Sequence, residues 1–190
     1  MKIISGKFKG KNFFMPQGLR ATQNIVRKAV FDLLGHDLEG LSFLELFAGS
    51  GAVGLEAMSM GASRVVLVEK DYKNAAVIEQ NLKLFGIDPL DGELTVQLFN
   101  TDAFVAIRQL ERFKKKFDIV FLDPPYEAEL AKKVLITLEG CDILHPNCFV
   151  VVQHVKREKM PPEEGRLKLE IQRKYGATYL SIYRIKESLG

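Results

Sequence analysis

Segments typical of strands and segments typical of helices alternate along most of this chain. Short apolar segments that run into turn or polar residues, as buried strands do, lie at residues 42–49, 63–70, 93–99, 117–126 and 148–154. Segments with apolar residues at helical spacing lie between them, at residues 50–61, 72–86, 103–115 and 127–139. Consecutive parallel strands need such crossover helices, so the alternation predicts an α/β, doubly wound fold with a mostly parallel sheet.

The C-terminal part of the chain predicts an antiparallel addition to that sheet. Residues 166–185 have the pattern of a hairpin whose turn lies at Tyr175-Gly176. The preceding residues 160–165 contain two prolines and a glycine and are expected to form a loop. The five alternating strands and the two hairpin strands together predict a seven-stranded, Rossmann-like sheet.

The N-terminal part predicts a small extension of the main domain. The segment KIISGKFKGKNFFMP has the pattern of two short strands around a glycine-rich turn. A helix is expected over residues 22–35, with Thr22 as its N-cap and Gly35 at its end. We therefore expect a hairpin and helix at 1–35 and the main domain at 36–190.

The composition suits one domain with a substantial core. The chain has 190 residues, of which 47% are hydrophobic. No apolar run approaches the roughly 20 residues of a membrane-spanning helix, and the N-terminus lacks the pattern of a secretory signal. Cys141 and Cys148 are too few for a disulfide framework, and with three scattered histidines they show no metal-site spacing. We expect a cytoplasmic protein with no bound metal and no membrane contact.

Basic residues gather near the N-terminus. The formal net charge is +3, yet residues 1–31 contain seven lysines and arginines and no acid, so the rest of the chain is mildly acidic. A basic arm of this kind favours a polyanionic partner, of which nucleic acid is the commonest. A solvated basic surface, or an arm that binds an acidic neighbour, would give the same charge pattern.

A glycine-rich motif follows the first strand of the alternating region. Gly49, Gly51 and Gly54 form G-x-G-x-x-G, which lets the backbone approach a ligand beside the N-terminus of the next helix. Nicotinamide-dependent enzymes use the same spacing, and a tight turn without a ligand would also produce it. Glu69 ends the second strand 20 residues after Gly49, where doubly wound folds place an acid against ribose hydroxyls. The alternative is that Glu69 only caps the next helix.

Two further acids follow strands of the same sheet. Asp102 ends the third strand and could accept a hydrogen bond from an adenine amino group, or could simply cap the next helix. Asp123-Pro124-Pro125-Tyr126 ends the fourth strand, which this topology places beside the first. The two prolines restrict the backbone around a carboxylate and an aromatic ring, which indicates a site that binds a base.

This constellation resembles the amino-group methyltransferases that use S-adenosylmethionine. The segments KIISGKFKGKNF, LRATQNIVRKAVFDLL and FLELFAGSGAVGLEA narrow the resemblance to the 16S ribosomal RNA guanine-N2 methyltransferases of the RsmD type, over nearly the whole chain. The resemblance implies a methyltransferase that modifies one guanine, conventionally numbered 966, in the small ribosomal subunit. It also implies a monomer that binds 16S ribosomal RNA in an assembling or assembled subunit.

The resemblance implies three sets of site residues. S-adenosylmethionine is expected at Glu45, Phe47, Ala48, Gly49, Ser50, Gly51, Glu69, Lys70, Asp102 and Ala103. RNA contacts are expected from Lys7, Lys9, Lys11, Arg20, Thr22 and Arg27, although Arg27 could instead form a salt bridge on its helix. The expected catalytic groups are Asp123, Pro124 and Tyr126. The Asp123 carboxylate and the Pro124 carbonyl would accept hydrogen bonds from the target amine, and Tyr126 would stack on the base.

Two positions depart from the family pattern, and three alternatives stay open. Ala21 stands where the family often has proline, and Gln153 stands where the fifth strand commonly ends in glutamate. An adenine-N6 methyltransferase acting on DNA or RNA would also use D-P-P-Y. A nicotinamide oxidoreductase would leave that motif and the basic arm unexplained. The third alternative is a binding module that has lost catalysis.

Overall fold

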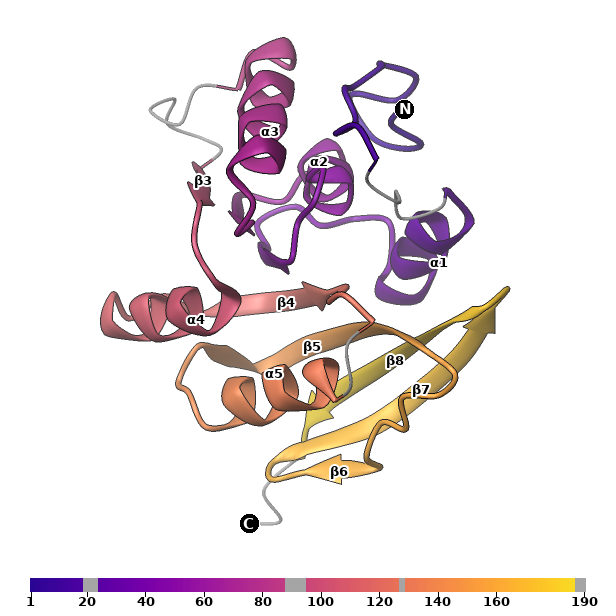
Figure 1. The fold of residues 1–190 in the computed structure, drawn as a ribbon, viewed down its shortest axis with the longest axis vertical. Helices are drawn as coiled ribbons and strands as arrows, with labels where there is room; N and C mark the ends of the chain where they lie inside the picture. The colour runs from indigo at the N-terminus through magenta and orange to yellow at the C-terminus, as the bar shows by residue number, and fades with distance from the viewer. Residues whose placement is uncertain (19–23, 88–94, 127–128, 187–190) are drawn as a thin grey trace.

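The computed structural model describes residues 1–18, 24–87, 95–126 and 129–186, and these residues form one eight-stranded sheet flanked by helices (Figure 1). The strands are β1 Ser42–Leu46, β2 Arg64–Val68, β3 Thr95–Phe99, β4 Phe117–Leu122, β5 Leu144–Val155, β6 Glu163–Glu164, β7 Leu167–Tyr175 and β8 Thr178–Ile185. The helices are α1 Asn24–Leu34, α2 Ala52–Ser59, α3 Tyr72–Leu84, α4 Ala103–Arg112 and α5 Leu130–Glu139.

The sheet has the predicted doubly wound topology. Its strand order is β3-β2-β1-β4-β5-β8-β7-β6, and the pairs among β1 to β5 are parallel. The C-terminal strands β7 and β8 form the predicted antiparallel hairpin, and β8 pairs with β5. Because the order changes direction between β2-β1 and β4, the carboxyl ends of β1 and β4 form the crevice where such folds bind ligands.

The prediction of seven strands was wrong by one. Residues 160–165, which we expected to form a loop, contain the two-residue strand β6, which pairs with the start of β7. Two contacts hold this segment against the sheet: the Tyr183 hydroxyl donates to the Pro161 carbonyl at 2.6 Å, and Lys186 Nζ lies 2.7 Å from Glu163 Oε2. A strand of two residues has no alternation of apolar and polar positions, so its sequence carries no recognisable pattern.

Helices cover both faces of the sheet. Helices α1, α2 and α3 pack on one face in a core that includes Ile119 and Phe121 of β4. Helices α4 and α5 pack on the other face over Val120 and Leu122 of the same strand. Within the described residues, no helix is long and apolar enough to cross a membrane.

The N-terminal segment lies against α2 and α3 rather than projecting from the domain. The predicted hairpin is present as a single antiparallel bridge between Lys2 and Asn12, not as two regular strands. Ile3 and Phe13 are buried in the same core as α1, α2 and α3. Residues 1–15 and α1 therefore share a hydrophobic core with the main domain. The predicted end of α1 at Gly35, where φ is +96°, is confirmed, whereas the Thr22 cap lies outside the described residues.

Candidate active site

The segments that follow β1 to β4 border a cavity of about 870 Å³ at the carboxyl edge of the sheet. This volume suits a cofactor or a comparable small molecule. The lining residues come from these segments and from the first turns of α3, α4 and α5: Phe47, Gly49, Val68, Glu69, Lys70, Asp71, Tyr72, Asn74, Thr101, Asp102, Ala103, Phe104, Asp123, Pro124, Pro125, Tyr126 and Leu130. The cavity thus brings together predicted residues from four separate parts of the sequence.

The glycine loop begins with an unusual backbone conformation. Phe47 has a φ of 59°, a left-handed conformation that is uncommon outside glycine, and Gly49 and Gly51 have φ values of 57° and 72°. The loop closes on itself, because Gly51 N–H donates to the Ala48 carbonyl at 2.7 Å. Gly54 has a different role: an added Cβ would lie 2.4 Å from Leu67 Cδ2, so its hydrogen lets α2 pack closely on β2.

Glu69 connects the end of β2 to the glycine loop and to α3. Its Oε2 accepts from Gly49 N–H at 2.6 Å, and its Oε1 accepts from Asp71 N–H at 2.8 Å. A carboxylate has about four acceptor positions, so lone pairs remain for ligand hydroxyls. The two backbone bonds hold the carboxylate in one orientation at the cavity wall. Asp71, not Glu69, caps α3, because its side chain accepts from Lys73 N–H and Asn74 N–H.

Asp102 caps helix α4 and also lines the cavity, and its contact with an adenine amino group stays a prediction. Its Oδ1 accepts from Phe104 N–H at 2.9 Å, so it is the N-cap of α4. Its Oδ2 lies 3.9 Å from Lys70 Nζ, at the cavity wall. Asn100 Nδ2 donates to the carbonyls of Glu69 and Lys70, which ties the ends of β2 and β3 together.

The segment Asp123–Tyr126 lies directly beside the glycine loop. Leu46 and Leu122 are the last paired residues of β1 and β4, so both segments leave the sheet at the same level. Arg157 Nη2, from the segment after β5, donates to the Tyr126 carbonyl at 2.8 Å. The backbone that carries the aromatic ring is therefore held by a side chain as well as by the two prolines.

Glu45 lies behind the cavity wall rather than in it. Its side chain is 3% exposed, and its Oε2 accepts from Gly54 N–H at 2.8 Å. Burial raises the pKa of Glu45 to about 8, and the charges of Asp123 and Glu69 add to this effect, although the N–H groups of Gly54 and Val53 oppose it. Glu45 therefore supports the glycine loop and α2 from behind the cavity wall, and its direct contact with the cofactor stays a prediction.

Three other expected cofactor residues also lie outside the cavity lining. Ala48, Ser50 and Gly51 form the turn of the glycine loop, and the Ser50 side chain is buried. Tyr72 and Leu130 also line the cavity, although neither was predicted from the sequence as a site residue. Tyr72 is the first residue of α3, which follows the end of β2, and Leu130 is the first residue of α5, which follows the D-P-P-Y segment. Their position at a helix start next to a predicted site segment was the sequence signal that could have identified them.

Comparisons with known proteins agree with this geometry. The family model described as "Conserved hypothetical protein 95" matches residues 1–184. The "Putative rRNA methyltransferase YlbH" of Bacillus subtilis is 31% identical over 97% of this chain and 98% of its own length. The "Ribosomal RNA small subunit methyltransferase D" of Buchnera aphidicola is 31% identical over 83% of this chain and 80% of its own length. The chain belongs to this RsmD-type family. The solved structure "Putative methyltransferase yhhF from Escherichia coli" superimposes with a TM-score of 0.85, at 26% identity and 99% coverage of both chains.

The methyl donor of this family is S-adenosylmethionine, and the cavity suits it. The lining includes four acids, Glu69, Asp71, Asp102 and Asp123, and one base, Lys70. An acidic cavity favours a ligand that carries a positive sulfonium. The acceptors at the ends of β2 and β3 that line the cavity are the carboxylates of Glu69 and Asp102. Among the described residues, no cluster of histidine, cysteine and acidic side chains could hold a metal ion.

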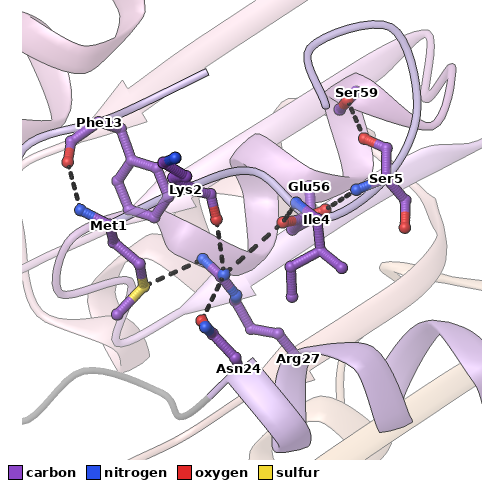
Figure 2. Close-up of polar contacts among 9 residues, drawn as sticks. All are labelled: Met1, Lys2, Ile4, Ser5, Phe13, Asn24, Arg27, Glu56 and Ser59. Atoms are coloured by element: carbon purple, nitrogen blue, oxygen red, sulfur yellow. Dashed lines mark hydrogen bonds and ion pairs between the residues drawn. The ribbon is translucent and has the colours of Figure 1, made fainter. Parts of the chain in front are cut away.

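The structure corrects the prediction that Arg27 contacts RNA. Its side chain is fully buried, and its Nη2 donates to the Lys2 carbonyl at 2.9 Å and to Asn24 Oδ1 at 2.8 Å (Figure 2). Its Nη1 reaches Met1 Sδ at 3.1 Å, and Nη2 lies 3.8 Å from Glu56 Oε1. The alternative of an ion pair was nearer to the outcome, although Glu56 is on α2 and not on the helix of Arg27. Arg27 therefore anchors the N-terminal segment internally.

The structure describes only some of the remaining RNA-contacting candidates. Lys7, Lys9 and Lys11 are exposed, so they are available to a partner. Arg20 and Thr22, like Ala21 among the family departures, lie outside the described residues.

The lysine-bearing turn lies at the far end of α2 from the cavity. Lys7 N–H donates to the Ser59 carbonyl at 2.7 Å, and Ser59 is the last residue of α2. Lys7 Nζ and Lys11 Nζ each lie 5.0 Å from the centre of the Phe8 ring. An eight-residue helix is about 12 Å long, so the lysines and the cavity are separated by roughly that distance.

Proposed function

We propose that this protein transfers a methyl group from S-adenosylmethionine to the exocyclic N2 amine of guanine 966 in 16S ribosomal RNA. The observation that carries the proposal is the position of Asp123-Pro124-Pro125-Tyr126, which lines the same cavity as Glu69 and Asp102. Relatives named as small-subunit ribosomal RNA methyltransferases support the choice of RNA.

The chemical step depends mainly on alignment. The cofactor supplies a methyl group on a cationic sulfonium, so the amine, the methyl and the sulfur must lie in line in a dry site. The lone pair of the guanine amine is delocalised into the ring, which makes the amine a weak nucleophile. The Asp123 carboxylate and the Pro124 carbonyl oxygen accept hydrogen bonds from the amine, raise the electron density on its nitrogen and orient it. Tyr126 stacks on the base, which leaves its RNA structure to enter the cavity.

The basic arm supplies the second part of the RNA site. Lys7, Lys9 and Lys11 contact phosphates, and Arg20 and Thr22 contact RNA nearer to the cavity. Because the lysines lie at the far end of α2, the bound RNA extends beyond the target nucleotide. An RNA surface of this extent is available in the cytoplasm in an assembling or assembled small subunit. A monomer of the protein acts on it there.

Product identification tests this proposal. The protein is incubated with isotope-labelled S-adenosylmethionine and small-subunit RNA or particles, and the RNA is digested to nucleosides for mass spectrometry. We expect label in N2-methylguanosine with the wild-type protein and at least about 100-fold less with Asp123→Ala, the scale of a lost transition-state contact. Label in N6-methyladenosine would support the adenine alternative and overturn the proposal.

A further inference from the structure

Gln153 is a buried side chain whose amide oxygen has no hydrogen-bond partner among the described residues. The side chain, near the end of β5, is only 4% exposed. Its Oε1 is buried and has no hydrogen-bond partner among the described residues. An unsatisfied buried polar atom costs about 1–3 kcal/mol, so such atoms are rare in folded proteins and call for an explanation.

His154, the next residue along β5, is a buried polar side chain whose ring nitrogens both have partners. His154 is also buried, yet its Nε2 lies 2.8 Å from Ser181 Oγ and its Nδ1 lies 3.1 Å from the Val155 carbonyl. Ser181 Oγ also accepts from Gln172 Nε2 at 2.9 Å. These polar side chains lie on the opposite face of the sheet from Gln153 and are paired across neighbouring strands, whereas the Gln153 amide oxygen is not paired.

The sheet register places Gln153 beside the proposed catalytic segment. Leu122 of β4 pairs with Val152 of β5, so Asp123 and Gln153 are the next residues along two adjacent parallel strands. Adjacent strands are about 4.8 Å apart. Val152 belongs to the core under α4 and α5, whereas Leu180, which pairs with Gln153, belongs to the core under α1. Gln153 therefore lies on the α1 face, one strand away from Asp123 and behind the residues that line the cavity.

We propose that Gln153 Oε1 accepts a hydrogen bond from the N1–H of the target guanine. This inference rests on the proposed function, because Asp123 must first hold the N2 amine. In guanine, N1–H lies next to N2 on the same edge of the ring, so a second acceptor one strand away meets it when Asp123 binds N2. Adenine has an unprotonated acceptor at N1, so the same oxygen disfavours adenine. Gln153 then determines base specificity, and its oxygen is satisfied only when substrate is bound.

A base analogue tests this contact directly. 2-Aminopurine keeps the exocyclic amine at position 2 but lacks the N1 hydrogen of guanine. Two RNA substrates with guanine or 2-aminopurine at the target position are compared in single-turnover reactions at saturating cofactor. We expect the wild-type protein to methylate the guanine substrate faster. We expect Gln153→Met, which keeps the side-chain length but has no amide, to reduce this preference about tenfold or more. Gln153→Glu, which keeps an acceptor, should retain it.

Two controls separate this role from a structural one. Gln172→Met removes an amide on β7 that already donates to Ser181 Oγ, so this variant should leave the base preference unchanged. Removing an amide whose oxygen is unsatisfied should also leave Gln153→Met at least as resistant to urea as the wild type. Gln153→Leu provides a second apolar variant if methionine fails to fold. An unchanged base preference in the apolar variants would overturn the inference. If instead the wild-type protein methylates neither substrate at N2, the proposed function itself has failed.

Discussion

Glu45→Gln tests the electrostatics beneath the glycine loop. The Glu45 pKa rises from an ordinary value of 4.5 to about 8, chiefly because the side chain is buried. Between these two pH values the folded protein keeps a proton that the unfolded chain releases, so stability falls as pH rises. At about 1.4 kcal/mol per pH unit, the loss over this interval reaches roughly 5 kcal/mol. Glutamine is neutral at every pH and its oxygen can still accept from Gly54 N–H, so the variant escapes this loss.

Urea unfolding of the ligand-free protein at pH 5, 6, 7 and 8 measures the effect. We expect the variant to differ little from the wild type at pH 5 and to gain stability over it by several kcal/mol at pH 8. Glu79→Gln, an exposed position on α3, controls for general changes of charge. A difference between the wild type and Glu45→Gln that stays constant from pH 5 to pH 8 would refute the reasoning, because Glu45 would then titrate as an exposed carboxyl does.

Two further predictions concern the N-terminal segment. Arg27→Met should destabilise the protein by about 3–5 kcal/mol in urea unfolding, because it leaves the Glu56 carboxylate buried without its cationic partner. Lys28→Met, at the next position, should change stability by less than about 1 kcal/mol, since its ion pair is exposed; similar losses in both variants would contradict the internal role of Arg27. Replacing Lys7, Lys9 and Lys11 together with alanine should flatten the plot of log RNA affinity against log salt by about two units, at about 0.7 per phosphate contact. An unchanged slope, with or without a loss of heat stability, would remove the arm from the RNA interface.

Strand and helix alternation made most of the fold predictable. The apolar segments and their order determine which strands are parallel, and the ends of β1 to β4 then locate the ligand crevice. This is why Glu69, Asp102 and Asp123 could be placed at one cavity from sequence alone. The short strand β6 could not be predicted, because it depends on contacts of Pro161 and Glu163 with distant residues.

The roles of individual side chains were less predictable than their positions. The family resemblance implied that Arg27 contacts RNA, but in the folded protein its guanidinium meets the Lys2 carbonyl and Glu56 of α2. The alternation of side chains along β1 directs Glu45 to the face covered by α2, where its carboxylate accepts a hydrogen bond from Gly54 N–H. The unpaired oxygen of Gln153 depends on what the neighbouring strands leave unsatisfied. Such facts arise from packing in three dimensions, which periodicity does not record.

The most direct test of the proposed function is a map of methylated nucleotides in small-subunit ribosomal RNA from cells that lack this protein. We expect one N2-methylguanosine, at position 966, to disappear. The wild-type chain should restore it, whereas the Asp123→Ala chain should not. Persistence of N2-methylguanosine at that position, or loss of a methylated adenosine instead, would contradict the account.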